Sequence, residues 1–215
     1  SQIFTPDSFE LSASRLISVL AKYRDEFGAE LAELDLGGGY AIAYVEGDKP
    51  SSAQEILSVI ATKVKTECEK ARLKIPRISI EPGRVIVGPS MVTIYKVGTT
   101  KEVSLADGTT RWYVSVDGGM SDNIRPALYE AQYSIALANR SSSAPLRKSR
   151  VVGKHCETGD IIIRDVQLPS DITPGDLLAV PATGAYGRSM ASNYNHMTRP
   201  PVICVLNGKA RSIIR

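Results

Sequence analysis

The sequence predicts an α/β unit over residues 1–90 followed by an all-β unit over residues 91–215. Before Ser90, stretches with apolar residues every three or four positions alternate with short β-branched runs, as in βα repeats. After Ser90, short β-rich runs separated by Gly, Pro and Asn turns take over, which is typical of all-β domains. With 215 residues and 43% hydrophobic content, the chain is long enough for one large domain or two small ones.

Composition excludes several classes of protein. Lys and Arg number 26 against 23 Asp and Glu, and no basic run is interleaved with aromatics, so no nucleic-acid partner is expected. No apolar run reaches the ~18 residues of a membrane span, and no secretory signal is visible. The three cysteines, Cys68, Cys156 and Cys204, are far apart, which indicates reduced thiols in a cytoplasmic protein. The two histidines are also far apart, so no metal site is expected.

The first unit begins with an amphipathic helix. Thr5, Pro6 and Asp7 are typical of a helix start, and Gly28 is typical of a helix end. The apolar stripe between them is expected to contain Phe9, Ala13, Leu16, Leu20, Tyr23 and Phe27. A strand over residues 31–36, a helix over 52–73 and a strand over 78–80 follow, an order that implies parallel strands.

The second unit is expected to consist of short strands. These span residues 91–97, 111–116, 133–137, 151–155, 161–166, 177–180 and 201–206. Asn207-Gly208 is a strong signature of a two-residue hairpin turn. Residues 188–196 predict one short helix.

Two strand ends in the first unit carry candidate ligand groups. Strand 78–80 runs into Glu81, Pro82, Gly83 and Arg84, where an acid and a guanidinium suit a ligand with both an anionic group and a protonated ring nitrogen. The alternative is a surface ion pair at a turn. The glycines at 37–39 end the preceding strand and suit a phosphate, or merely make a tight turn. Ends of neighbouring parallel strands lie side by side, which favours one phosphorylated cofactor.

The second unit has three further candidates. Arg125 and Tyr129, at the end of a long glycine-opened loop, suit a carboxylate, or simply pack the loop. Cys156 and Glu157 set a thiol beside an acid, although a lone cysteine is more often a small hydrophobic residue. Tyr186 lies between glycines and is either a ligand phenol or a surface tyrosine.

These motifs together resemble the fold-type III decarboxylases that depend on pyridoxal phosphate (PLP), and within that family the diaminopimelate decarboxylases. The matching segments cover the entire chain and include residues 34–40, 81–84, 122–129, 156–157 and 184–186. The Arg-Pro-Ala-Leu-Tyr and Cys-Glu segments are the most specific, because ornithine-type relatives would show Cys-Asp.

The resemblance implies a fold, a reaction and an assembly. Residues 1–90 would be the carboxy-terminal portion of a PLP-binding (β/α)₈ barrel, and residues 91–215 a β-barrel or sandwich domain. The implied reaction is decarboxylation of meso-2,6-diaminopimelate to L-lysine and CO₂, the last step of lysine biosynthesis, in a homodimer with shared active sites. The alternatives are a related ornithine-, arginine- or carboxynorspermidine-type decarboxylase and a catalytically inactive binding relative.

The resemblance also implies residue roles. Cofactor contacts fall to Ser1, Gly37, Gly38, Gly39, Glu81, Gly83, Arg84 and Tyr186. Substrate contacts fall to Arg84, Arg125, Tyr129, Glu157 and Tyr186. Glu81 resembles the acid that keeps the cofactor ring nitrogen protonated, and Cys156 resembles the residue that returns a proton to the α-carbon. Cys156 and Glu157 would enter the site from the other subunit.

Two features depart from the family pattern. Ala41 stands where the family often has a further glycine. The lysine that binds PLP and a histidine that stacks on it lie upstream of Ser1 in the pattern, so neither is expected in this chain. The chain also opens on Ser1 with no Met, which suggests a fragment that is inactive alone.

Overall fold

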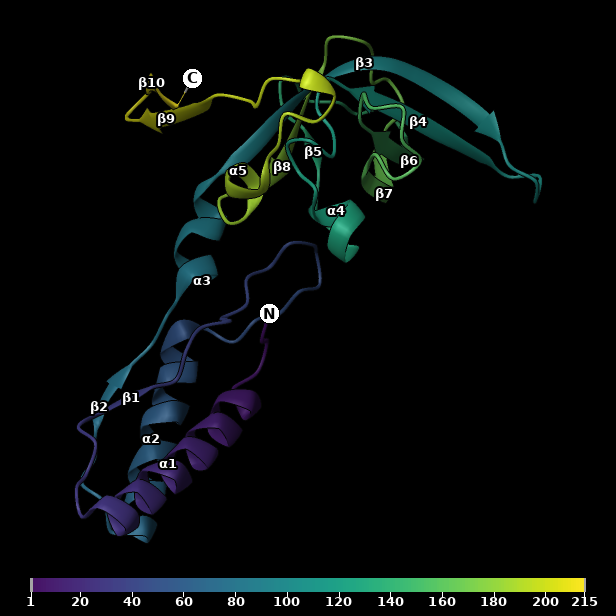
Figure 1. Ribbon diagram of the computed structural model, residues 1–215. Helices are drawn as coiled ribbons and strands as arrows, with labels where there is room; N and C mark the ends of the chain where they lie inside the picture. Colours follow the sequence, from purple (N-terminus) through teal and green to yellow (C-terminus); the bar gives the residue numbers. More distant parts are fainter. Residues whose placement is uncertain (1, 215) are drawn as a thin grey trace. The chain divides into compact units, whose positions relative to one another are not determined.

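The computed structural model describes residues 2–214, which fall into two compact units divided between Pro89 and Ser90 (Figure 1). The division lies where the sequence changes from helical to β-rich patterns. Within residues 2–214, no helix combines the length and the apolar character needed to cross a membrane.

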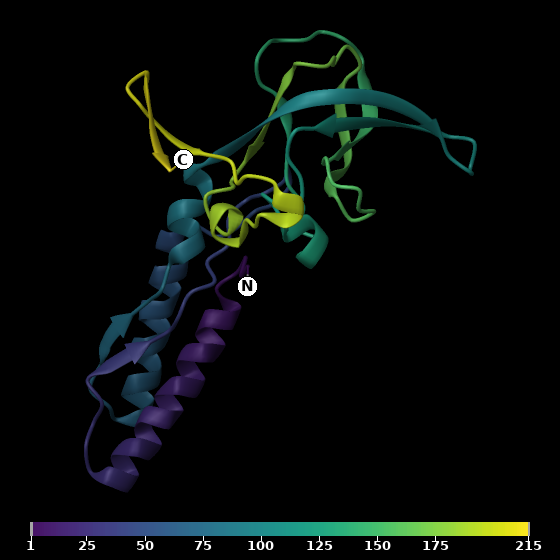
Figure 2. The ribbon, with the colours of Figure 1, turned by 45° about the horizontal axis from the view of Figure 1, so that its top comes forward.

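Two long helices, α1 (Asp7–Phe27) and α2 (Ala53–Ala71), lie side by side in the first unit (Figures 1 and 2). The α1 helix ends at Gly28, which adopts the left-handed φ of 66° that favours glycine. The α2 helix begins after Ser52, whose hydroxyl accepts a hydrogen bond from the Glu55 N–H. Both helices of the predicted pattern are confirmed.

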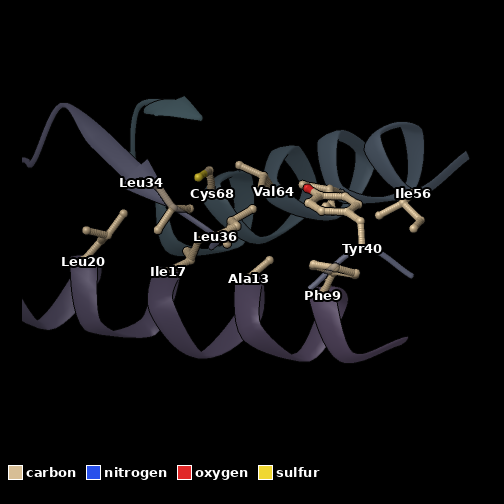
Figure 3. Packing of buried hydrophobic residues seen from close by; sticks show 11 residues of the cluster. Phe9, Ala13, Ile17, Leu20, Leu34, Leu36, Tyr40, Ile56, Val64 and Cys68 are labelled. Carbon is tan, nitrogen blue, oxygen red and sulfur yellow. The ribbon is translucent and has the colours of Figure 1, made fainter. Parts of the chain in front are cut away.

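The first unit also contains two short parallel strands, β1 (Glu33–Asp35) and β2 (Arg77–Ser79), with Leu34 opposite Ile78. The order strand, helix, strand therefore confirms the predicted βα unit. Side chains from α1, α2, β1 and the residues after β1 form one hydrophobic cluster (Figure 3). Its buried members are Phe9, Ala13, Ile17, Leu20, Leu34, Leu36, Tyr40, Ile56, Ile60, Val64 and Cys68.

The second unit contains a six-stranded sheet in the order β5-β8-β3-β4-β6-β7. Its strands are β3 (Val92–Ser104), β4 (Thr110–Val116), β5 (Ala136–Leu137), β6 (Leu146–Val152), β7 (Ile161–Pro169) and β8 (Leu177–Pro181). Neighbours are antiparallel except for the parallel pair β4 and β6. The long β3 pairs with β8 over its first part and with β4 over its second, so one strand connects both halves of the sheet (Figure 2).

A separate hairpin follows, formed by β9 (Val202–Leu206) and β10 (Lys209–Ile214). Asn207 and Gly208 connect the two strands with φ angles of 50° and 73°. Positive φ at both central residues is the geometry of a type I′ hairpin turn. The predicted hairpin is confirmed.

The irregular segments differ from the sequence prediction. The helix expected over residues 188–196 is two shorter helices, α5 (Gly187–Met190) and η2 (Tyr194–His196). The strand expected over residues 151–155 ends at Val152, and the residues after it form a loop.

Two short helices were not expected, because five residues are too few to show a helical period. They are α3 (Gly83–Val87), which continues into η1 (Gly88–Ser90), and α4 (Arg125–Tyr129). The α4 helix replaces the end of what was expected to be a long loop.

Candidate functional site

The glycine turn after β1 lies against the turn after β2. The Glu81 N–H donates a hydrogen bond of 2.8 Å to the Gly37 carbonyl. Gly38 packs so closely on this turn that a Cβ at position 38 would lie 2.2 Å from the Glu81 carbonyl oxygen. The predicted neighbourhood of the two strand ends is therefore confirmed, and only glycine fits at position 38.

The geometry of the glycine turn fits a phosphate group. Gly37 and Gly39 adopt φ angles of 70° and 98°. The Gly37 N–H donates to Asp35 Oδ1 at 2.8 Å, whereas the N–H groups of Gly38 and Gly39 have no hydrogen-bond partner within residues 2–214. Unpaired amide groups on a glycine turn are the donors that an anion needs, and the phosphate of PLP is such an anion.

Glu81 and Arg84 differ in how their side chains are held. The Glu81 side chain is exposed, and its carboxylate forms no hydrogen bond to the described part of the chain. Arg84 is buried, and its Nη1 donates to the Tyr44 hydroxyl at 2.7 Å, with the guanidinium carbon 5.7 Å from the Tyr44 ring centroid. Tyr44 escaped the sequence reasoning because it lies in an irregular segment with no periodic pattern.

A substitution at Gly38 tests this close packing. We expect Gly38→Ala to lower the free energy of unfolding by about 2–3 kcal/mol, because the new methyl group meets rigid backbone. Gly83→Ala is the matched control, since a Cβ there meets nothing within 4 Å and alanine suits a helix. Chemical unfolding of both variants is the measurement. Equal stability of the two variants would contradict the tight contact.

In the second unit, α4 brings Arg125 to two tyrosines. Arg125 is 9% exposed, and its guanidinium donates a hydrogen bond to the Tyr133 hydroxyl. The guanidinium carbon lies 5.5 Å from the Tyr133 ring centroid and 5.8 Å from that of Tyr186. Arg125 and Tyr186 therefore lie together, whereas Tyr129 is 62% exposed at the far end of α4. Tyr133 was missed because it reads as an ordinary strand residue.

Tyr186 has an unusual backbone conformation. Its φ is 65°, in the left-handed region, where a bulky side chain is rare and strained. Such strain is typical of residues whose side chain is held for a ligand, because the fold must stabilise it elsewhere.

A buried carboxylate joins the two loops nearest to Cys156 and Glu157. Asp160 accepts hydrogen bonds from the Met120 N–H at 2.6 Å and from the His155 N–H at 2.7 Å. Its own N–H donates to the Glu157 carbonyl at 3.1 Å, which closes the turn that carries both candidates. Sequence reasoning missed Asp160, because after Gly159 it looks like any turn residue.

Cys156 and Glu157 are both exposed at that turn. The Tyr194 hydroxyl donates a hydrogen bond to Glu157 Oε1. This hydrogen bond raises the pKa of the Tyr194 phenol, because ionisation would lose the bond and place two negative charges together. No sequence signal had pointed to Tyr194.

The predicted residues thus occur in separate groups. Gly37, Gly38, Gly39, Glu81, Gly83 and Arg84 belong to the first unit, and Arg125, Tyr129, Cys156, Glu157 and Tyr186 to the second. Ser1 lies outside the described residues. Within residues 2–214, no three His, Cys, Asp or Glu side chains are grouped so that they could hold a metal ion.

Known proteins resemble this chain over its whole length. It is 50% identical to diaminopimelate decarboxylase of Mycobacterium tuberculosis, over 100% of this chain and 49% of the relative. A crystal structure of the diaminopimelate decarboxylase of M. jannaschii with L-lysine matches with a TM-score of 0.90 and 28% identity, over 100% of this chain and 47% of that one. The crystal structure of the Helicobacter pylori diaminopimelate decarboxylase with L-lysine matches with a TM-score of 0.84 and 30% identity, over 100% of this chain and 49% of that one.

The chain spans about half the length of the curated relatives it matches. A family model described as "Pyridoxal-dependent decarboxylase, C-terminal sheet domain" matches residues 24–184, which is most of the chain. The chain therefore belongs to the family of pyridoxal-dependent decarboxylases.

Proposed function

We propose that this chain is the carboxy-terminal half of a diaminopimelate decarboxylase, which converts meso-2,6-diaminopimelate to L-lysine and CO₂ with PLP. The observation that carries the proposal is the turn that presents Cys156 beside the exposed carboxylate of Glu157. A carboxylate at that place suits a substrate with a second ammonium group. The 50% identity to the M. tuberculosis enzyme over the whole chain supports the same assignment.

The fold of the complete enzyme follows from this proposal. The first unit would be the last part of a PLP-binding (β/α)₈ barrel, which its parallel βα unit supports. The second unit would be the β-domain, which its six-stranded sheet supports. The free amide groups of Gly38 and Gly39 would hold the cofactor phosphate together with Gly37, Gly83 and Arg84, because the Glu81 N–H bonds the second turn to Gly37.

The chemistry divides between cofactor and protein. When bound, PLP supplies the conjugated ring that accepts the electron pair released as CO₂ leaves. The exposed carboxylate of Glu81 would hold a proton on the ring nitrogen, which keeps the ring electron-poor. Tyr186, with its strained backbone, would hold its phenol against the phosphate.

The charged groups of the substrate would be bound by side chains of opposite charge and by phenol donors. The side chains proposed to bind the substrate carboxylates are Arg84, Arg125, Tyr129 and Tyr186. Glu157 would bind the distal ammonium, and the Cys156 thiol would give a proton to the α-carbon after CO₂ departs. We further propose that the enzyme is a cytoplasmic homodimer in which Cys156 and Glu157 serve the partner's site.

Product analysis tests the function. The full-length protein that carries this chain should, with PLP, release CO₂ from meso-2,6-diaminopimelate and form L-lysine. Ornithine and arginine should react at least about 10²-fold more slowly in kcat/KM, because they leave charged groups of the site without partners. Preference for ornithine or arginine would assign the chain to another branch of the family. No CO₂ from any of these amino acids would support an inactive relative.

A further inference from the structure

The carboxylate of Glu157 is held through one oxygen only. Oε1 accepts the hydrogen bond from the Tyr194 hydroxyl, whereas Oε2 has no hydrogen-bond partner within residues 2–214. The backbone of Glu157 is fixed as well, because its carbonyl accepts the Asp160 N–H. A neutral phenol donor leaves the negative charge in place. The result is a carboxylate in a defined position with one oxygen open for a cation.

Tyr194 is itself held by a buried framework. Its ring lies 5.3 Å from the His155 ring, tilted by 52°. His155 is buried, with Nε2 hydrogen-bonded to the Ser121 hydroxyl at 2.8 Å and its backbone N–H bonded to Asp160. Three segments, around residues 121, 155 and 194, therefore meet at His155, and the phenol is positioned by packing as well as by its bond to Glu157.

We propose that Tyr194 is a positioning residue that fixes the Glu157 carboxylate for a cationic amine at the far end of the substrate. The inference rests on the function proposed above. A long, exposed glutamate samples several rotamers, and ordering it on binding weakens affinity. The bond from Tyr194 orders it beforehand. It also sets how far the amine must lie from the reacting α-carbon, so Tyr194 contributes to selection of substrate length.

The Tyr194→Phe variant of the full-length protein tests the role, because it removes one oxygen and keeps the ring on His155. We expect KM for meso-2,6-diaminopimelate to rise about tenfold, with kcat within about twofold of the unsubstituted protein. Tyr23→Phe is the matched control, since Tyr23 lies on α1 in the first unit and its ring contacts that of Phe27 at a tilt of 38°. It should leave both constants unchanged.

A double-mutant cycle shows whether Tyr194 acts through Glu157. Glu157→Gln should raise KM at least as much as Tyr194→Phe. The double variant should be no worse than Glu157→Gln alone, because the phenol then has no carboxylate to hold. Additive effects on KM, a loss confined to kcat, or an unchanged KM in Tyr194→Phe would each overturn the positioning role.

Titration of the phenol supplies a readout that does not depend on turnover. In protein labelled at the tyrosine ring carbons, the signal absent from Tyr194→Phe identifies this residue by NMR. Glu157→Gln should lower the pKa of Tyr194 toward that of an ordinary phenol, because the carboxylate is the cause of its raised pKa. An unchanged pKa would overturn the pairing. If the pKa falls but the unsubstituted protein releases no CO₂ from diaminopimelate, the pairing stands and the proposed function is wrong.

Discussion

Glu81→Ala in the full-length protein is expected to lower kcat by about 10²–10³-fold while PLP stays bound. Glu81 follows β2, its N–H is tied to Gly37, and its exposed carboxylate has no hydrogen-bond partner within residues 2–214. The backbone of Glu81 is thus held in place, and its carboxylate is free to bind a ligand. In the proposed role, loss of Glu81 would leave the ring nitrogen of bound PLP without its proton, and a neutral pyridine is a poor acceptor of electrons. Absorbance of the desalted protein measures bound PLP, and CO₂ release measures kcat.

A second substitution separates charge from volume at this site. Glu81→Gln keeps the shape of the side chain and removes its charge, so it should lower kcat nearly as much as alanine does. Glu46→Gln changes another exposed acid of the same unit and serves as the control. Turnover of Glu81→Gln within a few-fold of the unsubstituted protein would show that Glu81 has a different role.

Two inactive variants are expected to restore activity when mixed, if the proposed dimer shares its sites. Glu81→Ala removes a proposed catalytic group of the first unit, and Cys156→Ala removes one of the second. General acid groups typically raise the reaction rate about 10²–10⁴-fold, so each variant alone should be nearly inactive. In a mixed dimer, one site receives both defects and the other receives neither. Random exchange makes about half of the dimers mixed, so the mixture should recover about one quarter of the unsubstituted activity.

The mixing experiment needs proof of subunit exchange, which mass spectrometry of differently tagged chains provides. Each variant alone, taken through the same dissociation and reassociation, supplies the background. Exchange without recovered activity would mean that Cys156 serves the site of its own chain, and the shared site would be wrong.

The regular elements of the first unit were predictable because their signals are redundant. The α1 helix has a start signal, a periodic stripe and a terminal Gly28, and each indicates the same element. Within the stripe, the predicted Leu16 packs against the hydrophobic cluster but is only partly buried. Its neighbour Ile17, which was not predicted, is fully buried, because two adjacent apolar residues both fit a helical period. Phe27, expected in the stripe, is 61% exposed at the last turn.

The candidate site was only partly predictable for a different reason. Glycines, acids and cysteines at strand ends can be recognised along the sequence. Their supporting partners cannot, because Tyr44 and Tyr194 lie 40 and 37 residues from the side chains they bind. Tyr133 bonds to Arg125 from beyond the end of α4, and Asp160 joins the Cys156 turn to the distant Met120. A tyrosine in such a role looks like any other tyrosine until the fold brings it to an arginine or a glutamate.

The two pairings of β3 have a consequence for how the chain folds. Val92–Lys96 pairs with β8, more than 80 residues later in the sequence, whereas the rest of β3 pairs with the adjacent β4. During synthesis the hairpin can close at once, but the first part of β3 keeps an unpaired edge until Leu177–Pro181 emerges. Closure of such a long loop is slow, so the sheet completes late, and the unpaired backbone edge of Val92–Lys96 is open to self-association until β8 pairs with it.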